Sequence, residues 1–267
     1  MNHLKIIYLW FFLFSVTTLF AQSELIMKDL KLSQENVNCF KCDHYGNVYT
    51  ISKNTITKYT IEGEKIAVFS QQQWGDITSI EVHNPMKIML YFKDAGIILF
   101  LDEKLVSISE PFDLYNNYST VTLASYSTAN QIHLFDPSFS ELITLDFSFK
   151  EIGRLQLPFS DLEPCCMIEM NEKNLAIHDP VMGVSLFDSF GNFDKLIPIF
   201  SENICIDQDN IYYIQNQTLT IYNFKTLTFN QIHLNLEEEN IKQFDIFRNQ
   251  MIILEKSGKF LISSKLF

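Results

Sequence analysis

Pairs of an acidic residue and an amide recur along the sequence and carry its clearest chemistry. Each of the three pairs, and two further acidic residues, stands directly before a new segment of the chain. Carboxylate and amide oxygens are the ligands that a hard cation such as Ca²⁺ prefers. The candidate ligand-binding residues are Glu35, Asn36, Asp76, Glu163, Glu202, Asn203, Glu239 and Asn240. The alternative is a set of solvated connecting loops that are acidic because the whole surface is acidic.

The cysteines and the known catalytic motifs give weaker indications of a functional site. Cys39 and Cys42 have the C-x-x-C spacing of redox pairs and of half a zinc site, but no second such pair follows. We therefore interpret them as small apolar side chains in a strand. The sequence holds five cysteines, and an odd number in an exported chain leaves at least one thiol free or paired between chains. It contains no G-x-S-x-G, H-E-x-x-H or phosphate-binding glycine motif, so the catalytic residues are unknown.

The charge of the chain limits its partners. Its 20 basic and 32 acidic residues give a formal net charge of −12 and a pI of about 4.9. Nucleic acid is excluded as a partner because phosphate binding requires a basic stripe. Hydrophobic residues make up 47% of the chain, including 24 Phe, which is enough for a large core of pleated sheet.

Residues 1–21 have the pattern of a signal peptide. Lys5 provides the positive charge, an apolar stretch follows at 6–20, and Ala21 is a small residue at a plausible cleavage point. The alternative, an uncleaved membrane anchor, would need about 20 apolar residues. The sequence therefore predicts an exported, periplasmic or secreted protein. Its mature part, residues 22–267, would form one domain with no transmembrane segment.

A repeat of roughly forty residues organises the rest of the chain. Short apolar strands begin at positions 48, 88, 132, 175, 211 and 251, so successive starts differ by 40, 44, 43, 36 and 40 residues. The first five repeats each read as four strands separated by Gly, Asn, Asp or Pro turns. Sandwiches and barrels also have short strands, but they do not require a four-strand unit repeated six times. The predicted fold class is all-β, a six-bladed β-propeller.

The two ends of the chain support this count. The sixth repeat reaches position 267 after only three strands, whereas residues 24–32 form a spare strand before the first repeat. Pairing the spare strand with the last repeat would close the ring and cover two exposed strand edges. We also expect the fourth strand of the second repeat at 105–108 and the only short helical turn within 236–244.

The repeats over residues 24–267 resemble the degenerate six-bladed propellers of bacterial envelope proteins, a class with NHL-like and quinoprotein-like relatives. In that fold the acidic pairs stand where the innermost strands start, around one mouth of the central channel. The resemblance implies a non-enzymatic protein-binding or scaffold module of the cell envelope whose partner is another envelope protein. The alternative is a metal-dependent hydrolase similar to propeller lactonases, with its site at the acidic mouth. No cofactor is predicted apart from Ca²⁺ at that mouth.

Overall fold

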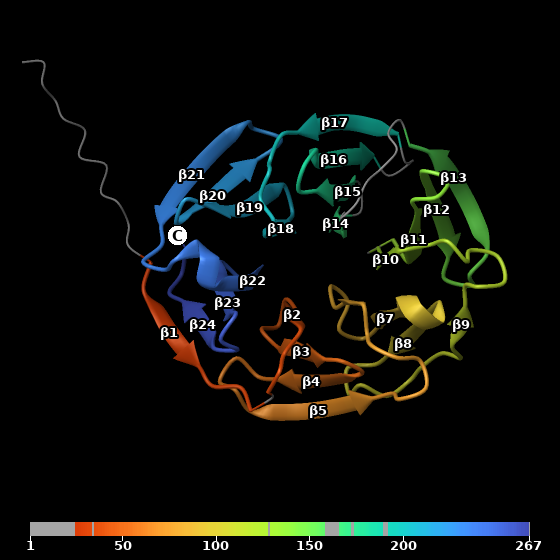
Figure 1. The fold of residues 1–267 in the computed structure, drawn as a ribbon, viewed down its shortest axis with the longest axis horizontal. Helices are drawn as coiled ribbons and strands as arrows, with labels where there is room; N and C mark the ends of the chain where they lie inside the picture. The colour runs from red at the N-terminus through yellow and green to blue at the C-terminus, as the bar shows by residue number, and fades with distance from the viewer. Residues whose placement is uncertain are drawn as a thin grey trace, which may run out of the picture.

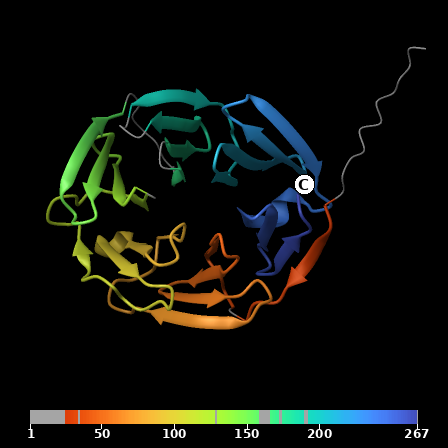
Figure 2. The same ribbon diagram turned by 180° about the vertical axis from the view of Figure 1, so that it is seen from behind.

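Six antiparallel sheets of four strands stand around one axis (Figure 1), and the view from behind shows the same ring (Figure 2). The computed structural model describes residues 25–33, 35–127, 129–157, 166–171, 174–188 and 192–266, and only the backbone for 166–171. The predicted six-bladed propeller is confirmed. The expected signal peptide lies outside the described residues. The described chain has two short 3-10 turns and no helix that could span a bilayer.

Each blade runs from an innermost to an outermost strand. The innermost strands are β2 (Cys39–Cys42), β6 (Ser79–Glu81), β10 (Leu123–Tyr126), β14 (Cys166–Asn171), β18 (Ile204–Asp207) and β22 (Ile241–Phe247). The second strands are β3 (Val48–Ser52), β7 (Ile88–Phe92), β11 (Gln131–Asp136), β15 (Asn174–Asp179), β19 (Asn210–Gln215) and β23 (Gln250–Glu255). The third strands are β4 (Thr55–Tyr59), β8 (Ile97–Leu101), β12 (Glu141–Asp146), β16 (Gly183–Asp188), β20 (Thr218–Asn223) and β24 (Phe260–Ser263). The outermost strands are β5 (Lys65–Ser70), β9 (Phe112–Asp113), β13 (Glu151–Gln156), β17 (Phe193–Ile197), β21 (Thr228–His233) and β1 (Met27–Leu30). We number the blades 1 to 6 from the blade that contains β2.

The N-terminal strand completes blade 6, as the sequence predicts. Strand β1 pairs antiparallel with β24, in a register that runs from Met27 opposite Ser263 to Leu30 opposite Phe260. Leu30 is buried in the apolar cluster between blades 6 and 1, and Leu25 is buried in the cluster between blades 5 and 6. The closing segment is therefore held by core packing on both faces of the blade as well as by strand pairing.

Apolar wedges fill the spaces between neighbouring blades. The described buried residues form six clusters, one at each of the six interfaces. Strand β7 is buried at all five of its positions because neighbouring blades cover both of its faces. This double burial explains why the second strands read as continuous apolar runs.

Two local predictions were wrong. The outermost strand of blade 2 is β9, not residues 105–108; of that stretch only Ser107 forms an isolated bridge, to Leu101. The Asp102 carboxylate accepts hydrogen bonds from two following backbone amides and holds this stretch in a turn. The chain also forms a 3-10 turn at Lys93–Ala95 that the sequence pattern did not indicate, whereas the turn expected within 236–244 is present at Glu238–Asn240.

Candidate functional site

Most of the predicted channel-mouth residues are exposed, and two of them form hydrogen bonds within the protein. Among them Asn203 is half-buried, and the other described ones are exposed. The Asn36 carbonyl accepts from Ser52, and the Asn240 side chain donates to Glu237. Glu163 lies outside the described residues. Within the described part of the chain, no three His, Cys, Asp or Glu side chains come close enough to hold a metal ion. The Ca²⁺ site therefore stays a prediction.

The C-x-x-C pair does not form a unit. Cys39 packs against the cluster between blades 1 and 2, whereas Cys42 packs against the cluster between blades 6 and 1. Residues three apart in a strand point to opposite faces. Cys39, Cys42 and Cys205 are free thiols. This geometry supports the interpretation of the pair as small core side chains.

The register of the blades gathers a different set of residues near the axis. The second strand of each blade contains an apolar run of four residues that begins at position 48, 88, 132, 175, 211 or 251. In every blade, one residue of the innermost strand pairs with the second residue of that run, as Lys41 pairs with Tyr49 and Asp245 with Ile252. We call these six positions the axial ring: Lys41, Glu81, Ser125, Ile168, Cys205 and Asp245. Because the position is equivalent in every blade, the ring lies at one level of the propeller.

Asp245 links three blades within this ring. Its side chain is 5% exposed and belongs to blade 6. Its Oδ2 accepts from the backbone N–H of Cys42 at 2.8 Å, and its Oδ1 accepts from the thiol of Cys205 at 3.2 Å. Oδ1 also accepts from the N–H of Ile246 at 2.9 Å. One carboxylate therefore satisfies donors of blades 1, 5 and 6.

A neighbouring glutamine seals the same junction. The Gln243 side chain accepts from the backbone N–H of Phe40 at 3.0 Å and donates to the Phe40 carbonyl at 2.8 Å. Strand β2 is the innermost strand of its blade, so its inner edge has no strand to pair with. The side-chain amide of Gln243 replaces that missing strand at one residue.

Burial controls the protonation of the ring. Burial raises the pKa of Glu81 to about 7, and the positive charge of Lys41 acts against this shift. The Glu81 side chain is half-buried, so part of it still meets solvent in the channel-facing strand. Burial and the negative charge of Asp245 raise the pKa of both Cys42 and Cys205 well above the ordinary value. These thiols are therefore protonated at neutral pH and are weak nucleophiles and metal ligands.

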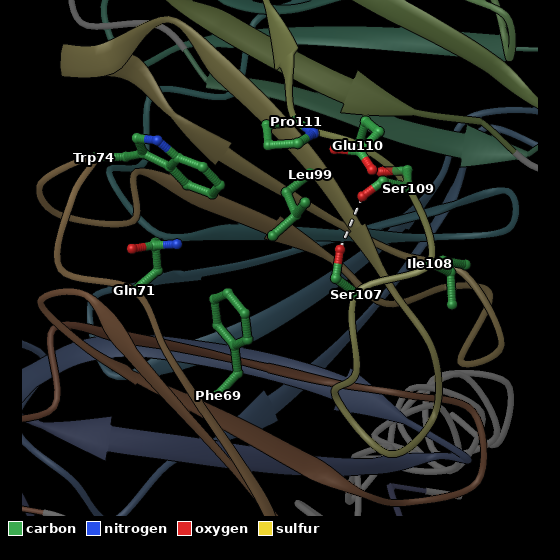
Figure 3. Close-up of a pocket in the computed structure, with 9 residues that line it drawn as sticks. All are labelled: Phe69, Gln71, Trp74, Leu99, Ser107, Ile108, Ser109, Glu110 and Pro111. Atoms are coloured by element: carbon green, nitrogen blue, oxygen red, sulfur yellow. Dashed lines mark hydrogen bonds between the residues drawn. The ribbon is translucent and has the colours of Figure 1, made fainter.

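The second candidate site is a groove at the rim, between blades 1 and 2. Its volume is about 640 Å³, within the usual range of ligand pockets. It opens where the outermost strand of blade 2 is interrupted before Pro111. Figure 3 shows the rings of Phe69 and Trp74 and the side chain of Leu99 facing the segment that carries the serines. The lining residues are Phe69, Gln71, Trp74, Leu99, Ser107, Ile108, Ser109, Glu110 and Pro111.

The floor of the groove is apolar and fixed in place. Leu99 belongs to the buried cluster between blades 1 and 2, and Phe69 and Trp74 pack against that cluster. The Trp74 ring meets Phe92 edge to face, with centroids 5.3 Å apart. This part of the core therefore continues outward to the solvent at the rim.

The polar side of the groove is partly engaged. The Ser107 hydroxyl donates to the carbonyl of Ser109, and the Ser109 hydroxyl accepts from the N–H of Phe100. Among the described residues Glu110 forms no ion pair, and the side-chain amide of Gln71 donates no hydrogen bond. The Glu110 carboxylate, the side-chain NH₂ of Gln71 and the hydroxyl proton of Ser109 thus remain for a bound molecule.

The sequence reasoning missed both sites. Three ring residues could have been suspected, because a charged residue between two apolar ones is unusual in a strand buried on both faces. The segments concerned are Phe40-Lys41-Cys42, Ile80-Glu81-Val82 and Phe244-Asp245-Ile246. The groove carries no such signal, because it depends on where one outer strand breaks.

The fold is similar to several solved propellers. Virginiamycin B lyase from Staphylococcus aureus superposes with a TM-score of 0.64 at 9% identity, over 90% of this chain and 99% of the lyase. The Pan2 WD40 domain of Neurospora crassa gives 0.65 at 7% identity, over 90% of this chain and 95% of that domain. BamB from Moraxella catarrhalis gives 0.51 at 8% identity, over 84% and 81%. No protein-family profile and no curated protein sequence matches the chain. At these identities the similarity shows the β-propeller fold alone.

Proposed function

We propose that this protein is exported to the cell envelope and acts there as a non-catalytic propeller that binds another protein. The observation that carries this proposal is the groove between blades 1 and 2. It is concave, its floor is an extension of the core, and strands of two blades, β5 and β8, carry Phe69 and Leu99. Partner side chains that anchor an interface fill pockets of this kind.

The rim of the propeller supports the same function. Large apolar side chains are exposed on the outermost strands of several blades: Ile66, Val68, Ile152, Phe193, Leu196 and Phe229. The apolar lining of the groove adds to them. Where such side chains lie next to one another, as Ile66 and Val68 do on β5, they offer apolar surface for a partner to cover.

Site-directed photo-crosslinking in intact cells tests protein binding. A photoreactive residue at Ile108, in the groove lining and 48% exposed, is expected to give one adduct of defined mass. The control position is Val181 in blade 4, which is 74% exposed. Adducts of equal yield and mixed mass from both positions, or none from Ile108, would contradict the proposal.

Export is tested separately. Sequencing of the N-terminus of the protein recovered from cell fractions is expected to begin at Gln22, with the protein outside the cytoplasm. Recovery of a chain that begins at Met1, in the cytoplasmic fraction, would show that residues 1–21 do not direct export.

A further inference from the structure

The geometry of the groove points to the chemistry of its occupant. We propose that the groove binds an extended segment of the partner in which a large apolar side chain stands next to a lysine or arginine. This inference rests on the protein-binding function proposed above. The apolar side chain lies over Leu99 between Phe69 and Trp74, and the basic side chain pairs with Glu110.

The inventory of free polar groups favours a peptide over a saccharide. A sugar carries a hydroxyl on most of its ring carbons and needs a partner for each hydroxyl that it buries. In the described groove the hydroxyls of Ser107 and Ser109 each already form one hydrogen bond within the protein, so few polar groups are left for the several hydroxyls of a sugar. An apolar side chain needs no such partners and gains from the removal of apolar surface from water.

The bound segment is held through its side chains and one backbone carbonyl, without adding a strand to blade 2. At the break, the carbonyl of Phe100 already accepts from the N–H of Ile108, and the N–H of Phe100 donates to Ser109. The side-chain amide of Gln71 is available to a peptide backbone. Its NH₂ group donates to one carbonyl of the segment, since the Oε1 of Gln71 already accepts from the N–H of Gln73.

The charge of the groove determines the polarity of the segment. Glu110 is exposed at the rim of the groove, where an exposed carboxylate attracts a cation at modest strength. The net charge of −12 adds a long-range preference for basic segments and against acidic ones. A basic residue beside the large apolar side chain is attracted both by the Glu110 carboxylate and by the net negative charge of the protein.

Panning of a random-peptide phage library on the purified protein tests the inference. Wild-type protein is expected to enrich sequences with a large apolar residue adjacent to Lys or Arg. Glu110→Lys should retain the apolar preference and exchange the basic preference for an acidic one. Trp74→Ala should lower the binding of the selected peptides by at least about tenfold. Phe229→Ala, which removes a 65% exposed aromatic side chain from the rim of blade 5, is the matched control and should bind as wild type.

Several outcomes would overturn the inference. They are the absence of an enriched motif, an unchanged motif with Glu110→Lys, or saccharide binding on a glycan array that Trp74→Ala abolishes. Glu110 is exposed, so its variant is expected to fold even if Trp74→Ala does not. If crosslinking at Ile108 captures a partner but the motif is absent, the segment chemistry is wrong and protein binding stands. If crosslinking fails as well, both proposals are wrong.

Discussion

Replacement of Asp245 by alanine should weaken the whole propeller. The carboxylate accepts from the N–H of Cys42, the N–H of Ile246 and the thiol of Cys205. At a side chain that is 5% exposed, water cannot readily replace it. The variant therefore leaves two backbone donors and one thiol without an acceptor across three blades.

The magnitude follows from these contacts. A buried backbone donor left without a partner costs about 1–3 kcal/mol, and the thiol, a weaker donor, adds less. The free energy of unfolding of Asp245→Ala should therefore fall by about 3–5 kcal/mol, a large part of the stability of an ordinary domain. Asp245→Asn keeps one acceptor oxygen at the same place and should lose about half as much.

Urea unfolding followed by circular dichroism measures this loss. Asp146→Ala is the matched control, because Asp146 also accepts from two backbone N–H groups, those of Ser148 and Lys150, in a turn at the surface. Water can reach these amides, so that loss should be about 1 kcal/mol. If Asp245→Ala loses no more than Asp146→Ala, the carboxylate does not link the blades as argued.

Three other changes test other parts of the structure. Glu81→Gln should change how stability depends on pH. The Glu81 carboxyl has a pKa of about 4.5 in the unfolded chain and about 7 in the folded protein. The free energy of unfolding of wild type, relative to that of the variant, should therefore fall by up to about 3 kcal/mol from pH 4.5 to 8. His133→Gln should make the free energy of unfolding less sensitive to acid. Burial lowers the pKa of His133 to about 4, so the stability that the neutral ring contributes is lost as pH falls from 6.5 towards that value. Gly63→Ala should lower the free energy of unfolding by at least about 2 kcal/mol. Gly63 has φ +89°, and a Cβ there would lie 2.3 Å from the carbonyl oxygen of Lys31, beside the closing strand.

These three predictions have specific controls. Urea titrations at a series of pH values compare the Glu81 and His133 variants with wild type, and parallel pH curves would contradict either assignment. For Gly63 the control is Gly75→Ala, where φ is +78° but no atom lies within 4 Å of the new Cβ, so the loss should be about 1 kcal/mol. Equal losses at the two glycines would show that packing against the closing segment is unimportant.

The sequence by itself determined the architecture, because the information is local and repeated. Alternation of apolar runs with Gly, Asn, Asp and Pro turns indicates the strands, apart from the outermost one of blade 2, and the period of about forty residues groups them in fours. A repeat with three strands and a spare strand at 24–32 allow one closure, and β1 pairs with β24 as that closure requires. Burial on both faces follows from the same runs.

Only the tertiary structure decided where the candidate sites lie. The axial ring exists because strands far apart in sequence share one register, so that the backbone of Cys42 meets the carboxylate of Asp245. No local pattern contains that register. The groove depends on the competition between the turn at Asp102 and continued strand pairing, which moved the outermost strand of blade 2 to Phe112–Asp113. The two arrangements differ by only a few hydrogen bonds, so contacts with the neighbouring blade decide which one forms, and the local sequence alone does not.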